Sequence, residues 1–282
     1  MTTPQPKVWL VTGVSSGFGR ELARAALGRG YTVVGTMRKE DQRAGFEALA
    51  PGRAHARLLD VTQAATIQGI VNEVIQRFGH IDVLVNNAGY GLFGAVEELD
   101  DAEGRRVLET NFFGTLNMVR AVLPHFRTRK AGHIVNMSSI AGLLGIAGVG
   151  LYCASKFAVT GLSESLAQEL APFGVRVTVV EPGGFRTNFA GGSMTMAKKL
   201  MSEYDGTPAA TPRAMREHYH GTEPGDPAKA AAAIITAVES PNPPTHLLLG
   251  PDALQYVRHK LAAFNQDMSA WEALSSGTNY DK

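Results

Sequence analysis

Cysteine is almost absent from this sequence, which has a single cysteine among 282 residues. One cysteine excludes an internal disulfide framework and any zinc site built on several cysteine ligands, and it suits a reducing compartment such as the cytoplasm. An excess of positive charge is also lacking, since 27 Lys and Arg residues stand against 26 Asp and Glu residues. A nucleic-acid-binding protein needs a basic face, so we expect no nucleic-acid partner. The eight histidines show no metal-ligand spacing, so we also expect no metal.

Signals for export or membrane insertion are lacking as well. The first residues, MTTPQPKVWL, have no basic start followed by a long apolar stretch, so we expect no signal peptide. The 22 uncharged residues from 134 to 155 are long enough to span a bilayer, but they include Asn136, Ser138, Ser139, Ser155 and four glycines. We interpret this run as a buried strand, a glycine-rich loop and the start of a helix, and we expect no membrane partner.

Glycine, in contrast, is abundant: it accounts for 31 of the 282 residues, roughly a ninth of the chain. The average share of glycine in proteins is about 7%. A collagen-like triple helix would need glycine at every third residue, and the sequence has no such period. The places where the glycines fall along the chain must therefore explain the excess.

Short runs rich in β-branched residues alternate along the chain with longer segments of helical period. We predict strands at 7–11, 32–36, 55–59, 81–85, 133–137, 175–180 and 247–249, and helices at 17–28, 62–78, 104–126 and 151–170. Strands that alternate with helices indicate βαβ units. The sequence therefore predicts an α/β fold in a single domain over 1–282, with a doubly wound parallel sheet of about seven strands and helices on both faces.

One segment, 188–227, departs from this alternation. It contains several prolines and three methionines, Met194, Met196 and Met201, without a clear strand. It follows the strand at 175–180, so it should lie near the carboxyl ends of the strands, where open α/β sheets bind their ligands. We interpret it as a mobile substrate lid; the alternative is a simple surface excursion.

A glycine-rich turn, Thr12 to Gly19, joins the first predicted strand to the first predicted helix. Glycines at 13, 17 and 19 permit a tight turn and let the backbone approach a pyrophosphate closely. The helix that follows offers free N–H groups and a positive dipole end to phosphates. A plain strand–helix turn seldom needs three glycines. The spacing also differs from the commoner GxGxxG fingerprint.

Further motifs follow in a fixed order. They are Asn86-Asn87-Ala88-Gly89, then Asn111, then Ser139, then Tyr152 with Lys156, and finally Pro182-Gly183 with Thr187. Together with the glycine turn, they resemble the short-chain dehydrogenases/reductases, in their single-domain branch, over residues 7 to about 187. The resemblance implies a Rossmann-type fold, a nicotinamide cofactor and oxidoreductase activity on alcohol or carbonyl groups.

Tyr152 and Lys156 are four residues apart on a predicted helix, so both side chains lie on one face. A tyrosine hydroxyl has an ordinary pKa near 10, and a nearby ammonium group or a nicotinamide cation would favour its ionised form. Tyr152 is thus the expected general acid/base. By resemblance, Lys156 also binds the nicotinamide ribose, Ser139 orients the carbonyl group, and Asn111 binds a water that links Lys156 to solvent. Ser138 is expected to make a structural hydrogen bond.

The cofactor preference is predicted from the end of the second strand. Relatives that prefer NAD place an acidic residue there, where this chain has Met37, and Arg38 could pair with a 2′-phosphate. We therefore favour NADP over NAD, although some NADP-dependent relatives carry a basic residue where this chain has Ser16. The full set of expected cofactor-binding residues is Gly13, Ser15, Ser16, Gly17, Phe18, Gly19, Met37, Arg38, Asp60, Val61, Asn87, Ala88, Gly89, Tyr152, Lys156, Pro182, Gly183 and Thr187.

The loop from 140 to 151 joins Ser139 to Tyr152 and is apolar, which favours a hydrophobic ketone or secondary alcohol as substrate. The stretch 86–97 is similar to the branch that includes 17β-hydroxysteroid- and retinol-type dehydrogenases. Relatives assemble through the two long helices, here 104–126 and 151–170, so we expect a homodimer or homotetramer. Two alternatives stay open: a sugar epimerase or dehydratase on the same fold, and a non-catalytic NADP-binding sensor.

Overall fold

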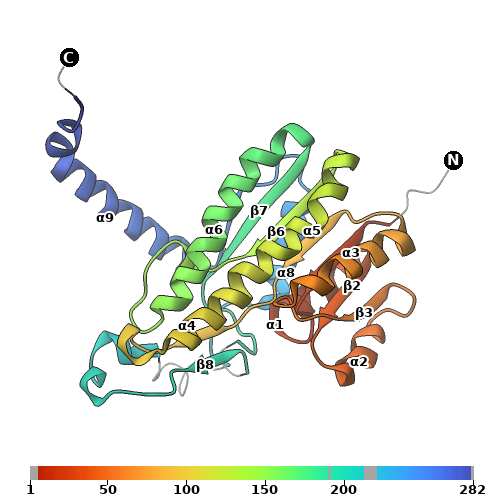
Figure 1. The fold of residues 1–282 in the computed structure, drawn as a ribbon, viewed down its shortest axis with the longest axis horizontal. Helices are drawn as coiled ribbons and strands as arrows, with labels where there is room; N and C mark the ends of the chain where they lie inside the picture. Colours follow the sequence, from red (N-terminus) through yellow and green to blue (C-terminus); the bar gives the residue numbers. More distant parts are fainter. Residues whose placement is uncertain (1–5, 190–191, 213–220, 281–282) are drawn as a thin grey trace.

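The computed structural model describes residues 6–189, 192–212 and 221–280, and its centre is one parallel sheet (Figure 1). The strands are β1 (Val8–Thr12), β2 (Thr32–Met37), β3 (Ala54–Leu58), β4 (Val83–Asn86), β6 (Gly132–Met137), β7 (Val175–Pro182) and β9 (His246–Leu249). Their order across the sheet is β3-β2-β1-β4-β6-β7-β9, and every neighbouring pair is parallel. The order reverses between β1 and β4, as in a doubly wound sheet, so the predicted fold class is confirmed.

Helices cover both faces of the sheet. Successive residues of a strand point to opposite faces, so each strand contributes to two cores. Trp9 and Val11 of β1 share one core with α1 (Gly17–Gly28), α2 (Arg43–Glu47) and α8 (Pro227–Glu239). Val8 and Leu10 of the same strand share the other core with α3 (Ala64–Phe78), α5 (Gly114–Arg129) and α6 (Gly150–Leu170). A strand buried on both faces has no polar alternation, which explains the unbroken apolar run of β1.

The long helix predicted at 104–126 is interrupted in the structure. It consists of α4 (Asp101–Leu108), a π-helical turn (Glu109–Phe113) and α5. A π-helical turn inserts one extra residue, and such turns are frequent at functional sites. The predicted site residue Asn111 lies inside this one.

The segment 188–227 is only partly within the described residues, because 190–191 and 213–220 lie outside them. In the described part, the prediction of no strand is wrong: β8 (Met194–Met196) pairs in parallel with β5 (Gly91–Phe93). The two strands are three residues each, too short for a hydrophobic pattern to show them. Single helical turns follow at Ser202–Tyr204 and Pro208–Ala210.

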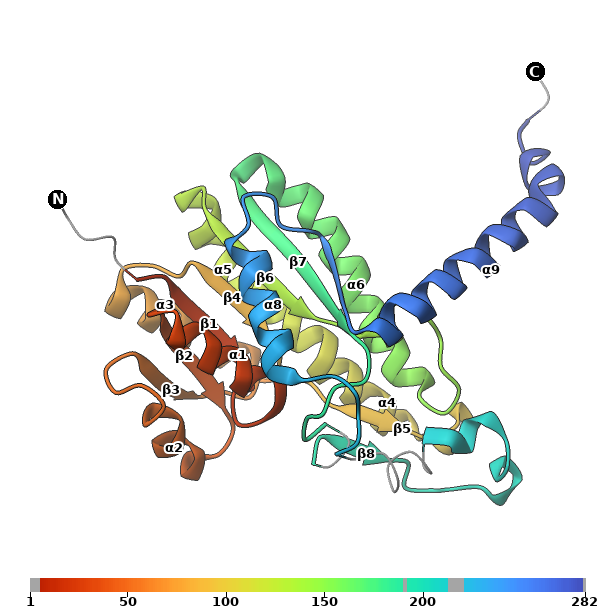
Figure 2. The same ribbon diagram turned by 180° about the vertical axis from the view of Figure 1, so that it is seen from behind.

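The uncharged run 134–155 forms most of β6, a loop and the start of α6, which confirms our interpretation of it, and no described helix is both long and apolar enough to cross a membrane. The last helix, α9 (Pro251–Ser276), leaves the body of the molecule and extends away from it (Figures 1 and 2).

Candidate active site

The glycine turn after β1 adopts a conformation that needs glycine at two positions. Gly13 and Gly17 have φ angles of 71° and 57°, in the left-handed region that side chains disfavour. The backbone N–H groups of Gly13 and Val14 both donate to the Thr36 carbonyl oxygen at 3.0 Å, which ties the turn to β2. Ser16 stands at the N-cap of α1 but makes no side-chain capping hydrogen bond. The N-terminal N–H groups of this helix are therefore suited to receive an anion.

The loop after β4 holds this turn in place. The Asn87 side-chain amide donates to the carbonyl oxygens of Thr12 and Gly13, both at 3.0 Å. In return, the Thr12 hydroxyl accepts the backbone N–H groups of Asn87 and Ala88. A Cβ on Gly19 would collide with the Asn87 amide nitrogen and the Gly13 carbonyl oxygen. Gly19 thus serves packing and does not line the cleft.

A single cleft of about 1400 Å³ lies along the carboxyl ends of the strands, and it gathers almost all of the predicted residues. Seventeen of the eighteen predicted cofactor residues line it, Gly19 being the exception, and so does Ser139. Asn111 does not line the cleft, because it is 1% exposed and lies behind Gly89.

Tyr152 and Lys156 project from the first turns of α6 into this cleft, and both are buried. Burial raises the pKa of the Tyr152 hydroxyl, and a hydrogen bond with Ser139 opposes this rise. Burial also lowers the pKa of Lys156 from 10.5 to about 8. The Lys156 ammonium donates to the Met137 carbonyl oxygen at 2.8 Å and lies 5.8 Å from the centre of the Tyr152 ring. The Lys156 ammonium thus lies beside the Tyr152 ring, and both side chains are buried.

Asn111 connects two parts of the site from behind. Its Oδ1 accepts the Tyr90 N–H, and its Nδ2 donates to the Tyr90 carbonyl oxygen and to the Ser155 hydroxyl, all at 3.0 Å. Ser155 lies on α6 between Tyr152 and Lys156. The π-helical turn thereby fixes the loop after β4 relative to the helix that carries the Tyr and Lys.

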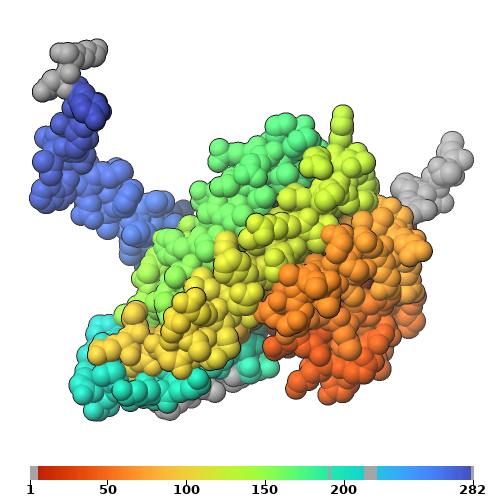
Figure 3. Space-filling model, in the orientation of Figure 1, coloured from red at the N-terminus to blue at the C-terminus, as the bar shows by residue number. Residues whose placement is uncertain are grey.

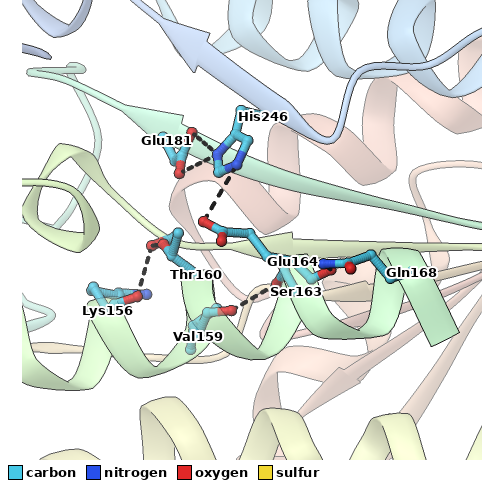
Figure 4. Close-up of polar contacts among 9 residues, drawn as sticks. Lys156, Val159, Thr160, Ser163, Glu164, Gln168, Glu181 and His246 are labelled. Carbon is cyan, nitrogen blue, oxygen red and sulfur yellow. Dashed lines mark hydrogen bonds and ion pairs between the residues drawn. The ribbon is translucent and has the colours of Figure 1, made fainter. Parts of the chain in front are cut away.

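Several separate groups of polar contacts lie along α6 (Figure 4). The Ser138 hydroxyl bonds the Lys156 carbonyl oxygen at 3.1 Å and the Thr160 hydroxyl at 2.9 Å, so the predicted structural hydrogen bond is confirmed. Farther along, His246 of β9 contacts Glu181 at 3.1 Å and Glu164 at 3.5 Å. Glu181 is fully buried, and burial raises its pKa. These contacts join α6, β7 and β9 beside the site.

A family model for the short chain dehydrogenases matches residues 7–198. This chain belongs to the short-chain dehydrogenase family. The order of motifs, the doubly wound sheet and the cleft at its strand ends all agree with this membership.

Individual members of the family are similar over most of this dehydrogenase. The 3-ketodihydrosphingosine reductase of Bacteroides thetaiotaomicron is 38% identical over 251 residues, which are 88% of this chain and 89% of the relative. Human retinol dehydrogenase 8 is 38% identical over 254 residues, which are 85% of this chain and 80% of the relative. A solved short-chain dehydrogenase from Streptomyces avermitilis is 42% identical, with a TM-score of 0.91, over 99% of this chain and 100% of that chain. The chain is accordingly an NAD(P)-dependent dehydrogenase or reductase.

Solved structures at lower identity contain either nicotinamide cofactor. A serine dehydrogenase complexed with NADP+ is 29% identical, with a TM-score of 0.73, over 86% of this chain and 94% of that chain. A family member from Burkholderia phymatum in complex with NAD is 27% identical, with a TM-score of 0.78, over 94% of this chain and 97% of that chain. The choice between the two cofactors therefore depends on this dehydrogenase's own residues.

Where β2 ends at the cleft, its last residue, Met37, and the next residue, Arg38, differ in exposure. Met37 is 2% exposed and packs into the core, whereas Arg38 is exposed at the cleft wall. Arg106 of α4, which the sequence analysis did not single out, also lines this cleft. Burial raises the pKa of Tyr90, and the nearby Arg106 and Arg38 oppose that rise. The dehydrogenase thus brings two cations to one region of the cleft.

The other end of the cleft is apolar, as the loop 140–151 predicted. Its buried members are Phe93, Ala141, Val149, Tyr152 and Cys153, with Ile146, Phe189, Met194 and Met196 packed against them. Phe189 stands 5.8 Å from the Tyr152 ring, centre to centre. Cys153 is a buried free thiol within this cluster, where it packs as a small apolar side chain.

Two buried carboxylates hold the described segment 194–201 over the apolar end, and neither was recognised in the sequence. Glu98 accepts the Met201 N–H at 2.8 Å and the Ala95 N–H at 2.7 Å. Glu103 accepts the Lys198 N–H at 3.2 Å while capping α4. The D-x-x-E pattern from Asp100 to Glu103 predicts the cap. It gives no sign that the same carboxylate reaches a segment almost a hundred residues later.

Proposed function

We propose that this dehydrogenase uses NADP to transfer a hydride between the nicotinamide and the carbonyl or alcohol of a hydrophobic ketone or secondary alcohol. The observation that carries the proposal is the convergence of Ser139, Tyr152 and Lys156 at the apolar end of the cleft. When bound, the nicotinamide supplies or accepts the hydride. The pyrophosphate of the dinucleotide would fit at the turn where Gly13 and Gly17 are left-handed and α1 begins without a side-chain cap.

Tyr152 is the proposed proton donor in reduction and proton acceptor in oxidation. Burial alone disfavours its ionised form, so the site needs a positive charge to compensate. Lys156 provides that charge, since a pKa of about 8 leaves it mostly protonated at neutral pH. Ser139, which already bonds Tyr152, would donate to the substrate oxygen as negative charge develops there.

Asn111 is a positioning residue in this proposal. It touches neither the cleft nor the reacting atoms, and it holds the Tyr90 backbone and Ser155 at fixed places. Tyr90 directly follows Gly89, and Ser155 directly precedes Lys156. Gly89 and Lys156 are both proposed to bind the cofactor. Asn111 therefore acts through the geometry of Gly89 and Lys156.

NADP is the proposed cofactor because of the residues at the end of β2. Met37 presents no carboxylate that would bond the ribose hydroxyls or repel a 2′-phosphate, and Arg38 stands exposed at the cleft wall. Steady-state kinetics with both cofactors test this. We expect a higher kcat/KM with NADPH, and a higher value with NADH would refute the preference. Arg38→Met should lower kcat/KM for NADPH and leave that for NADH nearly unchanged.

The substrate proposal follows from the apolar cluster around Phe93, Ile146 and Met194. Two relatives are named for bulky apolar substrates, a retinol dehydrogenase and a 3-ketodihydrosphingosine reductase. NADPH absorbance should fall when the enzyme is given apolar ketones or long-chain carbonyl compounds. Nucleotide sugars should give no such change; their conversion without net NADPH use would support an epimerase or dehydratase instead.

Substitution of Tyr152 by Phe tests the catalytic assignment. We expect Tyr152→Phe to abolish turnover while NADPH still binds with nearly the wild-type Kd, because the lost hydroxyl handles only the proton. Tyr31→Phe is the matched control, since Tyr31 lies outside the cleft and bonds Glu239. Retained turnover in Tyr152→Phe would refute the role. Absence of turnover in the wild type on every carbonyl compound, with tight NADPH binding, would favour a sensor.

We further propose that the segment from 188 to 227 is the substrate lid, with its stretch 194–201 as the fixed edge. Strand pairing with β5 and the carboxylates of Glu98 and Glu103 hold that edge. Assembly as a homodimer or homotetramer through the two long helical segments, 104–126 and 151–170, is also proposed. Phe113 and Phe157, at 43% and 44% exposure, offer apolar contacts there. Sedimentation of Phe157→Glu against wild type tests that surface.

A further inference from the structure

The last helix, α9, carries an unusual amount of exposed apolar surface for a helix in water. Every residue from 258 to 276 is exposed, and the helix stands clear of the body (Figures 2 and 3). At about 1.5 Å per residue, its 26 residues extend about 39 Å. The large exposed residues on this part are Leu261, Phe264, Met268, Trp271 and Leu274, at 51% to 68% exposure. A contiguous apolar surface of this kind marks an interaction site.

The spacing of these residues is that of a coiled-coil seam. Leu254, Val257, Leu261, Phe264, Met268 and Trp271 follow one another at alternating steps of three and four. Such a seven-residue period, with apolar residues at the two core positions named a and d, places one straight stripe along a helix and directs it at a partner helix. From Leu261 onward the stripe runs along a stretch of α9 in which every residue is exposed, whereas Val257 is half-buried where the helix leaves the body.

We propose that this stripe pairs with the α9 helix of a second copy of the chain, in antiparallel orientation. In such a pair, each a residue faces a d residue of the other helix. Leu261 then faces the partner's Phe264, and Met268 faces the partner's Val257. The two-fold symmetry of this arrangement repeats each contact, so the surface is self-complementary.

The charges that flank the seam select this orientation. In the antiparallel pair, Lys260 faces the partner's Asp267, and symmetry forms this ion pair twice. A parallel pair would instead place Asp267 against the partner's Glu272, two like charges. Opposite charges at such flanking positions favour an arrangement, and like charges disfavour it.

The same two residues also select the register. Sliding the antiparallel helices by one heptad in either direction places Lys260 opposite the partner's Lys260, or Asp267 opposite the partner's Asp267. Each alternative opposes like charges at the centre of the pair. A single register therefore combines apolar layers with opposite charges on both sides.

The polar face of α9 fits a second copy better than a lipid surface. Helices that lie on membranes are rich in Lys and Arg on that face. From 258 to 276, Arg258 and Lys260 are balanced by Asp267 and Glu272, so the formal charge is zero. Attraction to anionic headgroups is correspondingly weak, whereas both signs of charge are used in the self-pair.

The test is sedimentation velocity of the full chain over a wide range of concentration. Leu261→Glu with Met268→Glu places charge in the seam, and Ala262→Glu with Ser269→Glu adds the same charge one residue farther round the helix. We expect the first variant to lose one association step, with the association constant lower by about 100-fold or more, and the second to keep it. Equal behaviour of the two variants would overturn the proposal. Far-UV circular dichroism and NADPH binding check that both remain folded.

Charge variants test the orientation. Asp267→Lys should weaken association by about tenfold in the antiparallel pair, because it faces the partner's Lys260. Lys260→Glu combined with Asp267→Lys should restore it. Tighter association in Asp267→Lys alone would indicate parallel helices and refute the arrangement. A wild-type chain that shows no α9-dependent association, but sediments with phosphatidylcholine–phosphatidylserine vesicles, would refute the choice of partner.

Discussion

Burial of the Lys156 ammonium lowers the free energy of unfolding by an amount that can be measured. Burial lowers its pKa from 10.5 to about 8, which corresponds to about 3 kcal/mol, since one pKa unit is about 1.4 kcal/mol. The folded state bears this cost at neutral pH, where the side chain is charged. Its hydrogen bond to the Met137 carbonyl oxygen offsets the cost only in part.

The pH dependence of stability should therefore change when Lys156 is replaced by Met. Between pH 8 and 10.5 the folded chain has released the Lys156 proton, while the unfolded chain still holds it. The unfolded state then binds more protons, so the free energy of unfolding rises with pH. Lys156→Met removes this contribution. The difference between wild type and variant should grow by about 3 kcal/mol from pH 7 to pH 10.5 in favour of the wild type.

Urea unfolding at a series of pH values measures this difference directly. Lys199→Met is the matched control, because Lys199 is exposed and its loss should leave the wild-type pH profile unchanged. The reasoning would be refuted if Lys156→Met kept the same rise in stability with pH as the wild type. In parallel, alcohol oxidation at pH 7 should fall by about 100- to 1000-fold, because Tyr152 loses the cation that favours its ionised form.

Four further substitutions test other parts of the structure. Gly19→Ala should destabilise the fold by about 1–3 kcal/mol and weaken NADPH binding by fluorescence titration. Gly28→Ala, in the same helix with open space around it, should instead stabilise by about 0.5–1 kcal/mol. Burial raises the pKa of Glu181, so above about pH 4.5 only the folded state holds its proton, and the Tm of the wild type should fall as pH rises. Glu181→Gln should make this fall smaller. Glu98→Gln should cost about 1–3 kcal/mol and speed proteolytic cleavage near Met201, whose N–H loses a charged acceptor.

Much of the sheet could be predicted from the sequence, and the reason is its burial. A parallel strand covered on both faces gives an unbroken apolar run, as in β1, and helix α1 was predicted with its observed bounds, Gly17–Gly28. The π-helical turn at Glu109–Phe113 could not be predicted, because inserting one residue hardly disturbs the apolar period. The three-residue strands β5 and β8 carry no readable pattern either.

The residues of the candidate site also differ in how far the sequence could predict them. Residues in a motif with fixed spacing, such as Tyr152 and Lys156, lie together in the cleft as expected. Residues that act across long distances in sequence, such as Glu98 and Glu103, were missed, because their partners come from a segment with no motif of its own. The burial of Met37 next to an exposed Arg38 likewise required the tertiary structure.

The lone cysteine has a practical consequence. Cys153 is 4% exposed, and burial raises the pKa of its thiol, so the reactive thiolate is disfavoured and hidden from reagents in solution. A thiol introduced on the surface would therefore be modified almost alone, without first removing the native one. Spin labels or fluorophores placed singly on α9 or beside the cleft would then report distances between copies, and the motion of the segment over the cleft, in the otherwise unaltered enzyme.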